Sequence, residues 1–176
     1  KGDVIRAEDV EVLLRIGKEH IYVWEDDENM LHENDAAQVL RDLCQSEYMT
    51  ASEPKEGKIE LTSTVAGVFE VNEDALDAVN DITDVMIATI AQHFPVKAGT
   101  KLAGMRVIPL VIGKDVMKKV QETAGTEPLL RILPYRKMKV GVVTTGSEVF
   151  HGRIKDTFTP VIDSKLRAFG LQVDEH

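Results

Sequence analysis

The chain has 176 residues, and its composition excludes several classes of protein. Hydrophobic residues make up 43% and charged residues 29%, the balance of a globular chain that buries a core in one large domain or two small ones. The net charge of −9, without a Lys- or Arg-rich stripe, argues against nucleic-acid binding, and no apolar run approaches the roughly 18 residues of a membrane helix. The single cysteine, Cys44, leaves no internal disulfide, so we expect a reducing, cytoplasmic location.

In chain order, the first 135 residues predict a mixture of helices and strands. The start, KGDVIRAEDV, has no initiator Met and no signal-peptide pattern, so we expect a trimmed end. The predicted helices cover 7–16 (ended by Gly17), 36–44 (capped by Asp35), 72–82 (capped by Asn72) and 115–123. The predicted strands are 21–24, a hairpin over 57–72 that turns at 66–67, a buried strand at 85–90, and two extended pieces over 96–112. Residues 129–136 are predicted as a last strand or an extended connector. Because these elements do not alternate regularly, the predicted class is α+β.

Three further features of this region lead to predictions. KGDVI (1–5) and KAGTKL (97–102) are similar glycine turns, which we attribute to chance recurrence; the alternative is a β-clip or barrel-sandwich-like domain. An acidic loop is expected over 25–35, before the second helix. Met86, Met105 and Met117 are expected to fill gaps in the core.

The pattern changes at Lys139. Residues 139–145 (KVGVVTT) form a continuous apolar run, which is typical of a parallel strand covered on both faces. Thr159 is a suitable N-cap for a helix with Pro160 in its first position, Gly170 ends that helix, and 171–173 begin a second strand. These elements predict a βαβ unit with a right-handed crossover.

A small polar loop, TTGSE at 144–148, follows the first strand of this unit. Ligands in open α/β sheets bind at the carboxyl ends of strands. Gly146 allows close approach of the backbone to a ligand, and the hydroxyls of Thr144, Thr145 and Ser147 suit phosphate or carboxylate oxygens. The loop matches neither the P-loop nor the dinucleotide fingerprint, and an ordinary turn explains it about equally well.

Residues 139–176 resemble the opening of the molybdopterin-binding domain found in molybdenum-cofactor biosynthesis proteins of the MoeA, MogA and CinA type. The shared features are TGSE at 145–148, GRIKD at 152–156 and a helix that ends at Gly170. The stretches LLRIGKEHIYVWE, LHENDAA and KLAGMRVIPLVI also resemble the N-terminal part of a bacterial branch of molybdopterin-binding proteins. The resemblance implies an α+β N-terminal domain at 1–135 and, at 139–176, the first βαβ of a three-layer α/β molybdopterin-binding domain.

The resemblance also implies a ligand and a site. The ligand is molybdopterin or a related pterin phosphate, with Mg²⁺ and a molybdotransferase-like activity in the full-length protein. The implied binding residues are Thr144, Thr145, Gly146, Ser147, Glu148 and Asp156. Two departures limit this chain: Ser147 stands where the family has an Asp, and the later GGTG-like loop lies beyond His176. We therefore expect half a pocket, no activity and no tightly bound cofactor here. Since two parallel strands are unstable alone, the unit is expected to dock on the N-terminal domain, pair in a homodimer or be poorly ordered.

The remaining candidates have simpler explanations beside them. Asp156 is either a ligand to a metal or pterin amino group, or a carboxylate that precedes the helix near Thr159, where negative charge suits the helix dipole. His32, Glu33 and Asp35 could bind a metal and support a metal-dependent enzyme, but their spacing does not match HExxH. We favour the explanation that Asn34 or Asp35 caps the helix and His32 packs on it.

Arg106 could bind an anion through two hydrogen bonds, or it could be a solvated strand residue. Ser147 lacks a GxSxG context and an evident His partner, which disfavours a hydrolase. The main alternative function is a non-catalytic regulatory module that binds a partner or a metabolite through the N-terminal domain.

Overall fold

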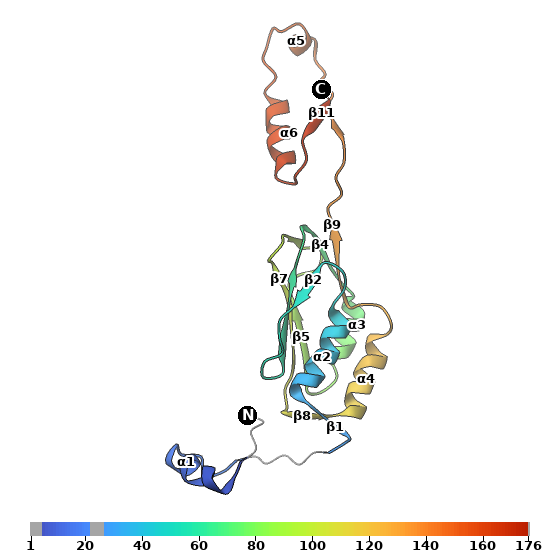
Figure 1. Cartoon of the computed structure of the whole chain (residues 1–176). Coiled ribbons are helices and arrows are strands. Elements are labelled where there is room, and N and C mark those ends of the chain that lie inside the picture. The colour runs from blue at the N-terminus through green and yellow to red at the C-terminus, as the bar shows by residue number, and fades with distance from the viewer. Residues whose placement is uncertain (1–4, 22–26, 176) are drawn as a thin grey trace.

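The computed structural model of the chain describes residues 5–21 and 27–175 (Figure 1). Within these ranges it contains six α-helices, one 3-10 turn and eleven strands, which confirms the mixed α+β class. The helices are η1 (Ala7–Asp9, 3-10), α1 (Val10–Arg15), α2 (Glu33–Cys44), α3 (Glu73–Asn80), α4 (Lys114–Ala124), α5 (Ser147–Phe150) and α6 (Phe158–Arg167). The strands are β1 (Met30–His32), β2 (Met49–Ala51), β3 (Lys58–Ser63), β4 (Gly67–Val71), β5 (Val85–Thr89), β6 (Pro95–Val96), β7 (Lys101–Val107), β8 (Val111–Gly113), β9 (Leu130–Pro134), β10 (Val140–Gly141) and β11 (Val173–Glu175).

The strands from β1 to β9 form three small antiparallel sheets. The largest has the order β2-β3-β7-β5, the second has the order β6-β4-β9, and β1 pairs with β8. Alternate residues of β3 are buried, which is the pattern of a strand with one face on the core and one toward solvent. We call this group of strands, with α2, α3 and α4, the central body.

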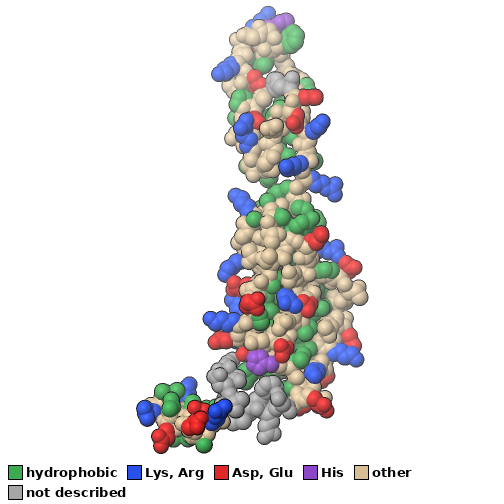
Figure 2. All heavy atoms as spheres, in the orientation of Figure 1, with side chains coloured by type: hydrophobic (Ala, Val, Ile, Leu, Met, Phe, Trp, Pro, Cys, Tyr) green, Lys and Arg blue, Asp and Glu red, His purple; other side chains and the backbone are tan. Residues whose placement is uncertain are grey.

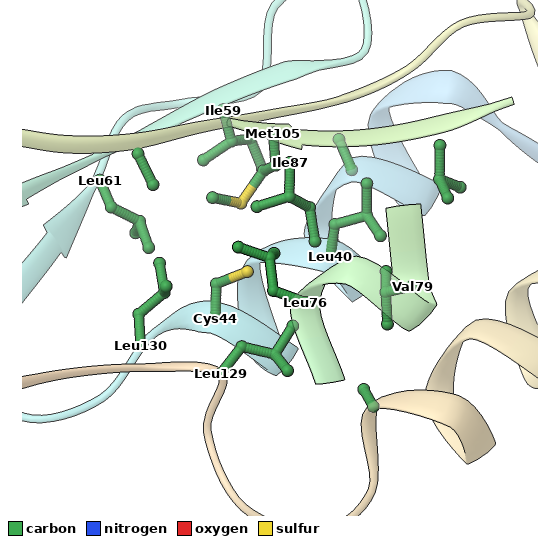
Figure 3. Packing of buried hydrophobic residues seen from close by; sticks show 14 of the residues in the cluster. Leu40, Cys44, Ile59, Leu61, Leu76, Val79, Ile87, Met105, Leu129 and Leu130 are labelled. Atoms are coloured by element: carbon green, nitrogen blue, oxygen red, sulfur yellow. The ribbon is translucent and has the colours of Figure 1, made fainter. Parts of the chain in front are cut away.

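Helix α4 packs on α2 and α3, and α2 packs on β3 and β7. On α2, Ala36, Leu40 and Cys44 recur every four residues and are fully buried, so one face of the helix covers the sheet. Figure 3 shows Ile59, Met105 and Ile87 of the sheet facing Leu40 and Leu76 of the helices. Burial of each such side chain stabilises the fold by about 1.5–3 kcal/mol.

Helix α2 begins earlier than the sequence predicts. Its N-cap is His32, whose Nδ1 accepts a hydrogen bond from the Asn34 backbone N–H at 3.2 Å, so the predicted caps Asn34 and Asp35 are wrong. The Asn34 side chain instead accepts from the Gly57 N–H at 3.0 Å and ties the helix to the β2–β3 connection. By contrast, Asn72 caps α3 as predicted, accepting from the Ala75 N–H at 3.4 Å.

The predicted hairpin over 57–72 is wrong. Strand β3 pairs with β2 and β7, whereas β4 pairs with β6 and β9 in another sheet. The Ser63 hydroxyl donates to the Val65 carbonyl at 2.7 Å, and the Gly99 N–H donates to the Ser63 carbonyl at 2.8 Å. These contacts hold the chain in a path that leaves one sheet and enters the next.

Other predictions differ in detail. The sequence does not predict the short strands β1 and β2, and the region 96–112 contributes to three strands rather than two pieces. Met105 and Met117 are buried as predicted, but Met86 is 48% exposed because it lies on the outer face of β5. The predictions are confirmed for three other segments, namely the helices at 73–80 and 114–124 and the strand at 130–134. The predicted strand at 21–24 falls mostly outside the described residues, as does the turn at 1–5.

The two ends of the chain bury fewer hydrophobic side chains than the central body does. Helix α1 forms as predicted, but Val10, Leu14 and Ile16 on it and just after it are 47–63% exposed. At the other end, β10 and β11 pair in parallel with α5 and α6 between them, the predicted βαβ order. The prediction that both faces of this first strand are covered is wrong, because the following Val143 is 88% exposed. No helix in the described ranges is long and apolar enough to cross a membrane.

Candidate functional site

The TTGSE loop lies between β10 and α5, directly after the first strand of the parallel pair. Gly146 adopts φ 138° and ψ 122°, in the region that favours glycine, and the chain then turns into α5. The sequence does not predict this single helical turn; it is closed by the Phe150 N–H donating to the Gly146 carbonyl at 3.0 Å. Thr144, Thr145, Ser147 and Glu148 are all exposed.

Asp156 brings the loop and helix α6 together. Its Oδ1 accepts from the backbone N–H groups of Phe158 at 2.8 Å and Thr159 at 3.2 Å. Its Oδ2 accepts from the hydroxyl of Thr159 and from that of Thr144 at 3.3 Å. The two threonine hydroxyls are themselves 3.3 Å apart. Thr144, Asp156 and Thr159 therefore form one hydrogen-bonded cluster, which we call the threonine–aspartate cluster.

The start of α6 corrects the predicted cap. The helix begins at Phe158, so Pro160 is its third residue rather than its first, and Thr159 lies inside the first turn. The carboxylate of Asp156 meets the exposed N–H groups there, which is the local hydrogen bonding expected of an Asp two or three residues before its donors. Thr159 instead directs its hydroxyl back to Asp156.

These hydrogen bonds also stabilise the ionised form of Asp156. The hydroxyl and the backbone N–H of Thr159 are the main causes that lower the pKa of Asp156 from 3.8 to about 2. The carboxylate stays ionised well below neutral pH, and it orients the Thr144 and Thr159 hydroxyls.

The remaining predicted residues are placed around this cluster. The carbonyl of Glu148 accepts from the N–H groups of Arg153 at 2.8 Å and Ile154 at 3.3 Å, which folds the GRIKD segment onto α5. Thr145 and Ser147 are exposed on either side of Gly146. The structure thus brings the two motifs of the resemblance to one end of β10.

The donor set suits an oxyanion or a polar heterocycle better than a resident metal. Threonine and serine hydroxyls supply donors and acceptors, whereas Mg²⁺ requires several oxygen ligands, usually including carboxylates. Both oxygens of Asp156 already accept hydrogen bonds. Across residues 5–21 and 27–175, no group of three His, Cys, Asp or Glu side chains is arranged to hold a metal ion.

The candidate metal residues His32, Glu33 and Asp35 are also not assembled for one ion. His32 uses Nδ1 as the cap of α2, Glu33 is buried at 3% exposure, and Asp35 is exposed. Their surroundings support a structural role at the start of α2.

The sequence predicts the Asp156 carboxylate near Thr159 at the start of a helix, but it does not predict the hydrogen bonds between these two residues, although their spacing gives a signal. An Asp three residues before a Thr at a helix start allows both a backbone and a side-chain hydrogen bond. The contact with Thr144, twelve residues earlier, has no such local signal because it depends on how the chain returns.

The family described as "Domain of unknown function (DUF8806)" matches residues 1–25 and leaves the rest of the chain unassigned. No curated protein and no solved structure matches the chain significantly.

Proposed function

We propose that residues 139–176 are the first βαβ of a three-layer molybdopterin-binding domain that follows an α+β domain at 1–135. In this proposal the 144–148 loop and the threonine–aspartate cluster form one side of a pocket for molybdopterin or a related pterin phosphate. The protein would act in the biosynthesis or handling of the molybdenum cofactor in the cytoplasm.

One observation carries the proposal. The TGSE and GRIKD segments, which carry the resemblance, meet just after β10: the Glu148 carbonyl of TGSE accepts from the Arg153 N–H of GRIKD at 2.8 Å. Thr144, the residue before TGSE, and Thr159 of α6 are both hydrogen-bonded to Asp156, the last residue of GRIKD. The carboxyl end of β10 is the edge at which open α/β sheets bind ligands. Gly146 and the hydroxyls of Thr145 and Ser147 would contact the pterin or its phosphate, while Asp156 would hold the hydroxyls in place. When bound, the cofactor would supply the pterin dithiolene that carries molybdenum.

The test is whether the pterin is retained. The 176-residue chain and a longer protein that contains it would be purified from bacteria that make molybdopterin and from a strain that cannot. Bound pterin would be measured as its fluorescent oxidised derivative. We expect retention by the longer protein, and about a tenfold loss in Asp156→Asn or Thr144→Val, since each removes hydrogen bonds to a charged group. Asp163→Asn is the matched control, because Asp163 lies on the same helix and pairs with Arg167.

Equal signals from the two bacterial strains would contradict the proposal, and so would an equal loss in Asp163→Asn. The second candidate function is a metabolite-binding module in the central body. A groove on the largest sheet of that body favours this second function.

A further inference from the structure

A groove of about 390 Å³ lies on the outer face of the four-stranded sheet, in the central body. It is lined by Arg106 of β7 and by six polar residues on and before β3: Ser52, Glu53, Lys55, Glu56, Lys58 and Glu60. Ile59, Leu61 and Met105 point into the core, so their neighbours Lys58, Glu60 and Arg106 point outward. The groove is therefore separate from the 144–159 site, and ligand binding in it does not depend on whether that site binds a pterin.

The wall formed by residues 52–57 is held in place by hydrogen bonds. Ser52 Oγ accepts from the Glu60 N–H at 3.0 Å, and the N–H and carbonyl of Lys55 both bond with Lys58 at 3.0 Å. Glu56 and Gly57 turn the chain with φ of 50° and 70°. The segment is thus fixed to β3 before any ligand arrives, which lowers the entropy cost of binding.

One of the carboxylates in the groove, that of Glu60, already forms ion pairs within the chain. Glu60 binds Lys58 Nζ at 2.6 Å and Lys101 Nζ at 2.7 Å. Hydrogen bonds from Lys101 and Lys58 lower the pKa of Glu60 to about 2. Glu60 thus sets one negative charge against the two positive charges of Lys58 and Lys101, and it forms no pair with the other cations of the groove, Lys55 and Arg106.

Arg106 is such a cation. In the strand register it lies between Lys58 of β3 and Met86 of β5, and its guanidinium has no ion pair or hydrogen bond in the described part of the chain. Like charges opposite one another destabilise a sheet, so an anion beside Arg106 would relieve this pair. There is room for one: a Cβ added at Gly104, on the same face, would have only Lys58 Cε within 4 Å, at 3.7 Å.

The other lining charges restrict the anion. Lys55 adds a second cation without an ion pair among the described residues, while Glu53 and Glu56 add two carboxylates that also lack one. These carboxylates repel a dianion such as phosphate more strongly than a monoanion. They can accept hydrogen bonds from an ammonium or hydroxyl group at the other end of a ligand.

We propose that this groove binds a small organic carboxylate that carries a donor group at its other end. Arg106 holds the carboxylate through two parallel hydrogen bonds, Lys55 adds a point charge, and Glu53 and Glu56 accept from the ammonium or hydroxyl group.

The test uses the whole chain, labelled with ¹⁵N and titrated with acetate, γ-aminobutyrate or inorganic phosphate at constant ionic strength. We expect saturable shifts of the Arg106 Nε–H and of backbone amides at 52–60, with tighter binding of γ-aminobutyrate than of acetate. Arg106→Gln should weaken binding by about tenfold or more, because a charge-assisted bidentate contact is lost. Arg131→Gln is the matched control, since Arg131 is an exposed strand arginine in the other sheet and pairs with Glu127.

Three outcomes would overturn the inference. One is the absence of saturable shifts with either carboxylate, and another is an equal loss of binding in Arg131→Gln. The third is phosphate binding as tight as that of γ-aminobutyrate, because the carboxylates of Glu53 and Glu56 would then have no effect on the choice of anion.

Discussion

Gly67 is the position where two strands approach too closely for any side chain. In the β4–β9 pair Gly67 lies opposite Pro134, and an added Cβ would collide with the Leu133 carbonyl oxygen and lie 2.9 Å from Ile132 Cγ2. The first obstacle is backbone, which cannot rotate away. Glycine is therefore required at position 67 because there is no space for a side chain, and not because of its backbone dihedral angles.

We predict that Gly67→Ala lowers the free energy of unfolding by about 2 kcal/mol or more, since the strands must separate to admit the methyl group. Gly104→Ala is the control, because its Cβ meets only Lys58 Cε at an ordinary distance. That change should stay within about 0.5 kcal/mol. Urea unfolding of both variants measures the difference, and equal losses would show that the close approach does not constrain the sheet.

A second residue-scale prediction concerns Asp156. Its pKa is about 2 in the folded chain, below the ordinary Asp value of 3.8 that applies when the chain is unfolded. The folded chain therefore binds this proton less well than the unfolded chain does. The carboxylate therefore stabilises the start of α6 above about pH 4, and this contribution is lost as the pH falls toward 2. NMR should show the Asp156 carboxyl carbon and the Thr159 amide titrating together near pH 2. In Asp156→Asn the Thr159 amide should lose this titration; a midpoint near 4 in the native chain would contradict the geometry.

At the scale of elements, the edge of β5 is protected by one side chain. Asn80, the last residue of α3, donates from Nδ2 to the Ile87 carbonyl and accepts from the Ile87 N–H with Oδ1, both at 2.9 Å. This amide takes the place of a neighbouring strand at the middle of an edge that could otherwise pair with another chain. The helix and the sheet are thereby locked together.

We predict that Asn80→Ala accelerates amide hydrogen exchange at Ile87 selectively, because the N–H loses its acceptor. The Ile90 N–H, which donates to the Leu102 carbonyl within the sheet, is the internal control. The loss of two hydrogen bonds to a half-buried backbone should also cost about 1–3 kcal/mol of stability. Unchanged exchange at Ile87 would mean that the edge is protected by other means.

The elements that local chemistry determines were predictable, and those set by distant partners were not. Helix α3 followed from the Asn72 cap and its apolar spacing, and α4 from periodicity alone. The prediction of a hairpin at 57–72 was wrong because alternation of apolar and polar residues predicts strands but not which strands pair. Strands β3 and β4 belong to different sheets. The predicted cap of α2 was wrong because the imidazole nitrogen of His32 accepts the hydrogen bond that a carboxylate or amide oxygen usually accepts. At the site, the strand-end position of TTGSE was predictable, whereas the contact from Thr144 to Asp156 depends on the return of the chain.

For the whole molecule, the burial of side chains divides the chain unequally. The central body contains the fully buried residues such as Phe69, Leu40 and Met105, whereas no described residue from 136 to 175 is buried. Phe150 and Phe158 are 87% and 77% exposed, although the Phe169 ring meets Tyr135 edge-on at 5.9 Å. Figure 2 shows acidic and basic side chains intermixed over the visible face of the central body. Most of the exposed large hydrophobic side chains lie outside that body, in 5–21 and 138–169.

This distribution predicts two levels of stability in one chain. Local opening requires little free energy where few apolar contacts are lost, so amides in 140–175 should exchange far faster than those of β3 and β7. Exchange followed by mass spectrometry on the intact 176-residue chain measures both regions at once. In a longer protein that adds strands beside β10 and β11, the proposed α/β domain requires the amides of 140–175 to become protected while β3 and β7 stay unchanged. Strong protection of 140–175 in the 176-residue chain itself would instead mean that this segment is covered in solution, by the central body or by a second copy.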